Sequence, residues 1–343
     1  SFVTDLKDIT EKDRARVGGK FYALARLLQS GINVPRAICI RTSAYQAFIQ
    51  STGLSERIRL EMSRKRFEEM RWEEIWDSAL RIRNLFANTS LPPDLAKPIR
   101  RAIVGYFNEK KVVVRSSAPA EDSAQASFAG LHESYVNIKG TEAILEHIKL
   151  VWASLWSDRA LLYRQELALD PVLSRMAVVV QEMIDEDRSG VAFGRDPREA
   201  GRNHAIVEAV PGPCGDLVDG LVDPDRWILD RSSGDVVEWR PGQREGKEEG
   251  PILESKDLHN LHQVLLQVES LFDWPPDTEW TGRGDRFTLL QARPITTAVA
   301  EAGDQRGWYL SLRPGMRRLN ALAERVAGQL IPELQDVGER FSL

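Results

Sequence analysis

The chain has 343 residues, of which 42% are hydrophobic and 28% charged, and its net charge is −5. This composition supports a sizeable core in roughly two domain-sized units and argues against a nucleic-acid binder, which needs a basic excess. No apolar run reaches the roughly 18 residues of a membrane span, and charged residues interrupt the start where a signal peptide would be apolar. We therefore expect a cytoplasmic protein.

Cysteine and histidine usage gives no sign of a metal centre. Cys39 and Cys214 lie far apart and can supply neither a disulfide framework nor a four-ligand zinc site, so we interpret both as packed residues. Metal-ligand spacing is also absent among the histidines, which we take as structural: His132, His147, His204, His259 and His262. The motifs of serine hydrolases, zincins and protein kinases do not appear, which disfavours those classes.

The first third of the chain is expected to be mostly helical. Gly18 and Gly19 precede a run of apolar residues at helical spacing, and Gly31 stands where a C-cap glycine is expected. The predicted elements here are, in order, a helix over 20–30, a short strand within 32–40 and helices from about 43 to 108.

Strands become frequent further along. Residues 110–117 and 133–138 read as strands, separated by a loop of small residues, and helical patterns return over 141–169. One helix is predicted at 256–272, and the strand-like segments of the second half are MAVVVQEMI, SGVAFG, HAIVEAV, RWILD, DVVEW and FTLLQA.

This order predicts an α+β fold with two subdomains and a ligand cleft between them. The helix-rich N-terminal subdomain is placed at 1–175 and the strand-rich C-terminal subdomain at 176–300. Residues 301–343 have the helical pattern of a connector into a next domain.

The segment Val17-Gly18-Gly19-Lys20 is a candidate phosphate site. Glycines at a helix start let backbone amides approach an anion, and the lysine adds a point charge. It is not a Walker A motif, because Phe21 stands where Ser or Thr is required. The alternative is a helix start with a solvated lysine.

Arg115 follows an apolar strand directly, and α/β folds commonly place ligand groups at strand ends. It could equally be a surface ion-pair residue.

A hairpin is predicted from Thr278–Arg283 and Phe287–Arg293. By the two-residue period Gln291 and Arg293 share one face, and Glu279 reaches the same neighbourhood. Hard oxygen ligands suit magnesium bound to nucleotide, so Glu279 and Gln291 are candidate ligands. The alternative is a hairpin carrying ordinary polar residues.

The apolar strand at 176–184 runs into Gln181, Glu182 and Met183. Adenine needs apolar walls and a backbone that offers one donor and one acceptor, which this segment could provide. A buried strand without a ligand is the alternative.

Seven ordered segments together resemble the ATP-grasp domain of the phosphoenolpyruvate synthase and pyruvate phosphate dikinase family, to which rifampin phosphotransferases also belong. The resemblance covers about Phe2 to Thr297. Its segments are VGGK at 17–20, GINVPRA at 31–37, VVVRSSAPAED at 112–122, SFAG at 127–130, VQEMI at 180–184, SGVAF at 189–193 and LLQARPIT at 289–296.

The resemblance implies roles for individual residues. It makes Lys20, Arg115 and Arg293 phosphate-contacting catalytic cations, and Glu279 and Gln291 the Mg²⁺ ligands. The remaining ATP-binding positions that it implies are Gly18, Gly19, Ser127, Gly130, Gln181, Glu182, Met183, Glu208 and Asp216. Family members split ATP to AMP and pass phosphate through a histidine on a swivelling domain to pyruvate, or to rifampin in the drug-modifying branch.

The chain departs from the family pattern at one loop. In the segment 208–220, Gly215 replaces the family's second glutamate. Asp216 is the expected replacement carboxylate one residue later, and the alternative is a loop that has lost a nucleotide contact. Partner domains carrying the histidine and the acceptor site are absent from the sequence. Two alternatives therefore accompany the enzyme interpretation: a non-catalytic ATP-binding regulatory module, and an interaction scaffold that binds no nucleotide.

Overall fold

The computed structural model describes residues 1–119, 122–123, 126–127, 133–198, 202–218, 220, 222–242, 250–284 and 286–295. These residues belong to one compact unit, Ser1–Thr296. The predicted connector at 301–343 lies outside the described residues.

Helices dominate the first half, as predicted. They are α1 (Arg14–Gln29), α2 (Thr42–Ser51), α3 (Leu54–Met62), α4 (Trp72–Ala87), α5 (Pro93–Phe107), α6 (Thr141–Ser154) and α7 (Asp158–Glu166). In α5 the buried residues Leu95, Ile99, Ile103 and Phe107 recur every four positions, so one apolar stripe faces the core. At the end of α1 the Ile32 N–H donates to the Leu27 carbonyl, and Gly31 has φ +85°, which confirms the predicted glycine cap.

A five-stranded antiparallel sheet has the order β1-β2-β7-β3-β6. Its strands are β1 (Val3–Asp5), β2 (Ala37–Ile40), β3 (Val112–Ser117), β6 (Ser134–Ile138) and β7 (Ala177–Glu182). Both faces of the central strand β7 are buried: Val178 and Val180 pack in a cluster with α2, α4 and α6, and Ala177 and Val179 pack with α1. This explains why β7 is apolar from Ala177 to Val180 rather than alternating.

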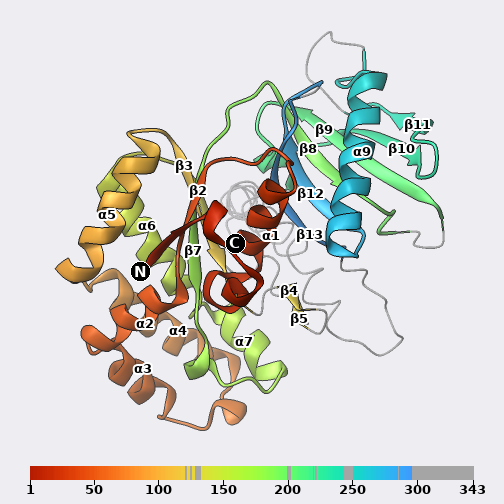
Figure 1. Ribbon diagram of the computed structural model, residues 1–343. Helices are drawn as coiled ribbons and strands as arrows, with labels where there is room; N and C mark the ends of the chain where they lie inside the picture. The colour runs from red at the N-terminus through yellow and green to blue at the C-terminus, as the bar shows by residue number, and fades with distance from the viewer. Residues whose placement is uncertain are drawn as a thin grey trace, which may run out of the picture. The chain divides into compact units, whose positions relative to one another are not determined.

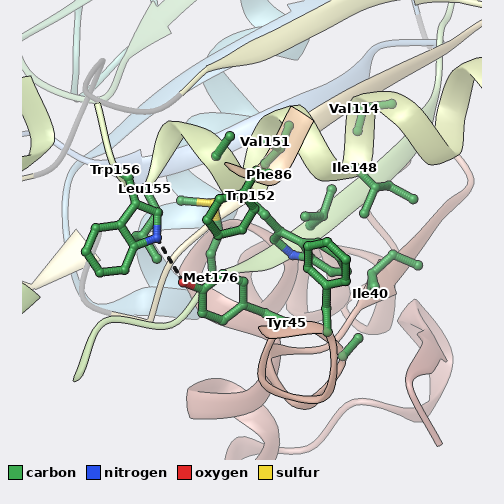
Figure 2. Close-up of a cluster of buried hydrophobic side chains, with 14 of the residues drawn as sticks. Ile40, Tyr45, Phe86, Val114, Ile148, Val151, Trp152, Leu155, Trp156 and Met176 are labelled. Carbon is green, nitrogen blue, oxygen red and sulfur yellow. Dashed lines mark hydrogen bonds between the residues drawn. The ribbon is translucent and has the colours of Figure 1, made fainter. Parts of the chain in front are cut away.

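Aromatic side chains fill the core between this sheet and its helices (Figure 2). Tyr45, Phe86, Trp152 and Trp156 are all at most 2% exposed. Trp156 Nε1 donates a hydrogen bond of 3.0 Å to the Tyr45 hydroxyl. Burial raises the pKa of Tyr45, so the hydroxyl stays protonated.

A six-stranded antiparallel sheet has the order β11-β10-β9-β8-β12-β13 (Figure 1). Its strands are β8 (Arg188–Phe193), β9 (His204–Pro211), β10 (Asp225–Asp230), β11 (Val236–Arg240), β12 (Pro276–Thr281) and β13 (Thr288–Pro294). The long helix α9 (Ser255–Phe272) covers one face, where Leu258, Leu261, Leu265 and Val268 pack on the strands. The short helix α8 (Gly215–Val218) and the small pair β4 (Asp122–Ser123) and β5 (Ala126–Ser127) were not predicted.

Segregated helices and antiparallel sheets confirm the α+β class. The division at 175/176 stays a prediction, but β7 begins after it and lies between β2 and β3, so the first sheet draws on both sides of that division. Cys39 and Cys214 are buried and unpaired, as expected for packed residues. Among the described helices, none has the length and apolar character needed to cross a membrane.

Candidate functional site

Gly18 holds α1 against the end of β3. Its φ of +75° and ψ of +169° interrupt the helix, so a short helical turn precedes the main run. A Cβ at this position would lie 2.1 Å from the Ser117 carbonyl oxygen, which only glycine avoids. Next to this contact, the Phe21 N–H donates to Ser117 Oγ at 3.2 Å. The glycine pair is thus a point of close packing as well as a helix start.

Lys20 lies at the same junction. Its Nζ donates to Ser116 Oγ at 3.3 Å, across 96 positions of sequence. The glycine-lysine segment and the strand that carries Arg115 therefore meet, as the phosphate-site hypothesis requires.

Arg115 reaches from the five-stranded sheet to β13 of the six-stranded sheet. Its Nη2 donates to Gln291 Oε1 and lies 3.8 Å from Glu279 Oε2, while Nη1 donates to the Leu290 carbonyl at 3.5 Å. The Arg115 side chain is 12% exposed. Of its two possible roles, an exposed surface ion pair is wrong, because this guanidinium is mostly buried between the two sheets.

The predicted hairpin is confirmed, with β12 and β13 in the register Glu279–Gln291 and Asp277–Arg293. Residues directly opposite in antiparallel strands point to the same face. Following the register through the neighbouring strands adds Val191 of β8, then Glu208 of β9 and Arg226 of β10, to the row of Glu279 and Gln291. We call this the polar row: Arg226, Glu208, Val191, Glu279 and Gln291.

Three carboxylates on this face each have an arginine beside them. Glu208 Oε1 accepts from Arg226 Nη1 at 3.0 Å, and Asp277 Oδ2 accepts from Arg293 Nε at 2.7 Å. Arg115 accompanies Glu279. Burial raises the pKa of Asp277, and the Glu279 charge adds to this, while Arg293 opposes both.

Apolar side chains flank the polar row on the same face. Val191, Val210, Cys214 and Leu217 form a small buried cluster with Phe193 beside it. Burial raises the pKa of Cys214 to about 12, so its thiol stays protonated. The face thus combines charged pairs with an apolar patch, the mixture that small-molecule sites present.

The strand proposed to bind adenine agrees with the prediction only in part. Gln181 is 2% exposed, and its Nε2 donates to the Leu290 carbonyl at 3.3 Å, so it joins Arg115 at β13. The N–H groups of Glu182 and Met183 donate to the carbonyls of Arg36 and Lys111. These two N–H groups are therefore already bonded, so an adenine ring would need a different backbone donor.

The structure thus links Gly18 and Lys20 to the end of β3, and links Arg115 of β3 to Glu279 and Gln291. Arg293 lies two residues beyond Gln291 and pairs with Asp277, Gln181 contacts the Leu290 carbonyl, and Glu208 lies along the polar row. The Glu182 carboxylate is not part of it, because alternation turns it away from Gln181 to pair with Lys110. Gly130 and the side chains of Ser127 and Asp216 lie outside the described residues.

Sequence reasoning missed four polar residues here. Ser116 and Ser117 contact the glycine-lysine segment, Asp277 pairs with Arg293, and Arg226 pairs with Glu208. Asp277 could have been found, because it precedes Glu279 by two positions and so shares its face. The partnership of Arg226 could not, since it depends on the register of β9 and β10.

Glu279 and Gln291 fit a magnesium ion by chemistry. One carboxylate and one amide oxygen face each other across two strands, and Mg²⁺ on a nucleotide commonly takes only one or two protein oxygens, with phosphates and waters completing the shell. No group of three or more acidic, histidine or cysteine side chains that could hold a metal by itself occurs in the described ranges. The donor set therefore suits a metal that arrives with phosphates.

Comparison with known proteins gives a consistent result. Residues 14–307 match the family described as pyruvate phosphate dikinase, AMP/ATP-binding domain. Rifampicin phosphotransferase of Streptomyces sviceus is 36% identical over 89% of this chain and 37% of its own length. A probable phosphoenolpyruvate synthase of Methanocaldococcus jannaschii is 30% identical over 86% of this chain and 27% of its own length. Prodigiosin synthesizing transferase PigC of Serratia marcescens is 30% identical, over 87% and 33%. The chain thus spans about a third of the length of these relatives.

Proposed function

Because the chain belongs to the pyruvate phosphate dikinase AMP/ATP-binding domain family, we propose that it binds MgATP and passes phosphate to a histidine on a separate swivelling domain. Members of this family have the ATP-grasp fold, which the seven sequence segments also indicated. Pyruvate or a similar molecule is the proposed final acceptor, held by a further domain. The protein would then act as the ATP-dependent part of a dikinase-type phosphotransferase.

The observation that carries this proposal is the convergence of cations from three separate segments. The Lys20 ammonium contacts Ser116, the neighbour of Arg115 in β3, and Arg115 touches the hairpin that carries Arg293. Cations brought together from such distant positions are typical of a site for a polyanion such as triphosphate. Magnesium, when bound at Glu279 and Gln291, would supply further neutralisation of phosphate charge.

Each residue would contribute through position and charge. The helix that restarts after Gly18 points its N-terminus at the phosphates, and Lys20 contributes a point charge. Arg115 and Arg293 offer forked donors to phosphate oxygens. Holding the phosphate in line with an incoming imidazole is the main catalytic effect available here, since phosphoryl transfer depends on positioning and electrostatics.

The phosphate acceptor within the relay is proposed to lie on another domain. His147 binds a carbonyl of its own helix, His262 is buried in α9, and neither they nor His204 and His259 contact Lys20 or Arg115 in the described part. His132 lies outside the described residues.

A labelling experiment tests the proposal. The chain is incubated with ATP labelled in the β-phosphate, with and without a swivelling domain from a relative, and label in protein is followed. We expect ATP binding by the chain alone, and labelled protein plus AMP only when the domain is added. Label on a histidine of this chain by itself would contradict the relay, and absence of ATP binding would contradict the nucleotide site.

Two narrower alternatives have specific support. Gly215 in place of the family's second glutamate favours a non-catalytic ATP-binding module, which would bind ATP but label no partner domain. Similarity to the Streptomyces relative favours a rifampicin-phosphotransferase-like enzyme. Supplying the corresponding acceptor domains in trans, with rifampicin or pyruvate, separates the two from each other and from the main proposal.

A further inference from the structure

Both proposed metal ligands contact the same positive charge. Nη2 of Arg115 donates to Gln291 Oε1 and lies 3.8 Å from Glu279 Oε2. The two residues are directly opposite each other in β12 and β13. A divalent cation placed between them would meet the guanidinium, so ion and Arg115 cannot both hold these oxygens.

We propose that Arg115 occupies the place of the metal in the nucleotide-free protein, so that Mg²⁺ enters only together with nucleotide. This inference rests on the proposed function, because it assigns an order of binding to the same site. The guanidinium neutralises Glu279 and occupies one lone pair of Gln291 Oε1, so a bare divalent ion would have to displace it to bind both residues.

The charge balance of the sheet face supports this role. Asp277 is paired with Arg293, Glu208 with Arg226, and Glu279 with Arg115. Each of these three carboxylates therefore has a positive neighbour, so among the described side chains of this face their charges are balanced without a divalent ion. The mostly buried position of Arg115 strengthens its competition, because charges interact more strongly away from water.

Nucleotide reverses the competition. Triphosphate oxygens offer Arg115 stronger acceptors than the amide oxygen of Gln291, and charge-assisted bonds of this kind are the strong ones. Once Arg115 turns to phosphate, Glu279 and Gln291 can accept the ion that the nucleotide carries. The guanidinium thus moves from Gln291 to phosphate as the metal binds Glu279 and Gln291. Both changes of partner stabilise the complex with nucleotide and metal.

The test measures metal binding without turnover. Mn²⁺, which accepts the same oxygen ligands, is titrated into the full chain and followed by electron paramagnetic resonance, with and without a non-hydrolysable ATP analogue. Without nucleotide, Arg115→Met should bind Mn²⁺ about tenfold or more tightly than the wild type. With the analogue present, the same variant should bind the analogue and its metal more weakly than the wild type. This change of sign is not expected of a purely structural residue.

Two further variants complete the design. Arg115→Gln keeps an N–H donor for the Leu290 carbonyl, and it should show the same direction even if the methionine variant fails to fold. Arg81→Met removes an equal charge beside Glu61 and Asp77 of helices α3 and α4, outside the candidate site. It should leave Mn²⁺ affinity without nucleotide unchanged.

The outcomes separate this inference from the proposed function. Equal Mn²⁺ affinity of wild type and both Arg115 variants without nucleotide would overturn the inference, as would an equal gain in Arg81→Met. Failure of the wild type to bind the ATP analogue would overturn the proposed function instead. If the Arg115 variants nevertheless bound Mn²⁺ more tightly than the wild type, Arg115 would still be shown to occupy the place of the metal.

Discussion

The two sheets of this protein carry their functional groups in different places, because they are buried differently. The centre of the five-stranded sheet is covered on both faces, so β7 is apolar from Ala177 to Val180 and becomes polar at Gln181, while in β3 Arg115 follows the apolar run 112–114. The six-stranded sheet is covered by α9 on one face, so β12 alternates and Glu279 lies in mid-strand. A doubly buried sheet contributes groups from its ends, and a singly buried sheet contributes them from a whole face.

The largest effect is expected at Gly18, where α1 packs against the end of β3 in the five-stranded sheet. Gly18→Ala places a Cβ 2.1 Å from the Ser117 carbonyl oxygen at a φ of +75°. Strain in such conformations costs roughly 1–3 kcal/mol, and the steric overlap adds to it. We expect a lower free energy of unfolding in urea and loss of ATP binding.

The control is Gly105→Ala, where the added Cβ meets nothing within 4 Å inside α5. Alanine should stabilise that helix by about 0.5–1 kcal/mol. Equal stability of the two variants would refute the close packing of Gly18 against β3.

A second comparison tests burial directly. Val179→Thr puts a hydroxyl into β7, where the side chain is fully buried, and should cost about 1–3 kcal/mol. Val237→Thr makes the same change on β11, where the side chain is 56% exposed, and should change stability by less than about 0.5 kcal/mol. Chemical unfolding of both variants measures the difference. Similar costs would show that the two sheets are not buried as described.

The third prediction concerns the three proposed phosphate-binding cations, which come from α1, β3 and β13. Lys20→Ala, Arg115→Ala and Arg293→Ala should each weaken ATP binding about tenfold or more, because charge-assisted hydrogen bonds contribute roughly 1.5–3 kcal/mol. Titration calorimetry provides the measurement. Lys110→Ala, which removes an exposed lysine paired with Glu182, should bind ATP as the wild type does. Unchanged affinity in all three site variants would remove the phosphate assignment.

The fourth prediction applies to metal dependence. Glu279→Ala should keep part of its nucleotide affinity through the cations but lose the increase that Mg²⁺ provides, because one of two protein oxygens is gone. Nucleotide titrations with and without Mg²⁺ give this dependence. A variant with wild-type magnesium dependence would exclude Glu279 as a ligand.

The smallest effect is a pH dependence at Asp277. Burial raises its pKa above 3.8, so the folded state holds this proton more tightly than the unfolded state. The contribution to stability is therefore fully present below the unfolded pKa and is lost as pH rises through the folded pKa. Relative to Asp277→Asn, the wild type should lose stability over this window. Urea unfolding of both proteins at pH values from acidic to neutral measures the free energy of unfolding against pH. If the two free energies changed with pH in the same way, the prediction would be contradicted.

Local patterns in the sequence determined the elements and the shared faces within them. The four-residue recurrence in α5, the glycine cap of α1 and the two-residue period of Gln291 and Arg293 each depend on neighbours in the chain, so they could be read without a structure. The same holds for the ordered segments that indicated the family.

Only the tertiary structure decided which elements meet. Gly18 and Ser117 are far apart in sequence, and their contact exists because α1 packs across the end of β3. Arg115 contacts Gln291 because the edge strand β13 lies beside the five-stranded sheet, and no local sequence pattern predicts that contact. Strand alternation predicts which face a side chain occupies, but the packing of one sheet against another decides what it touches there, and at Arg115 that contact carries the chemistry.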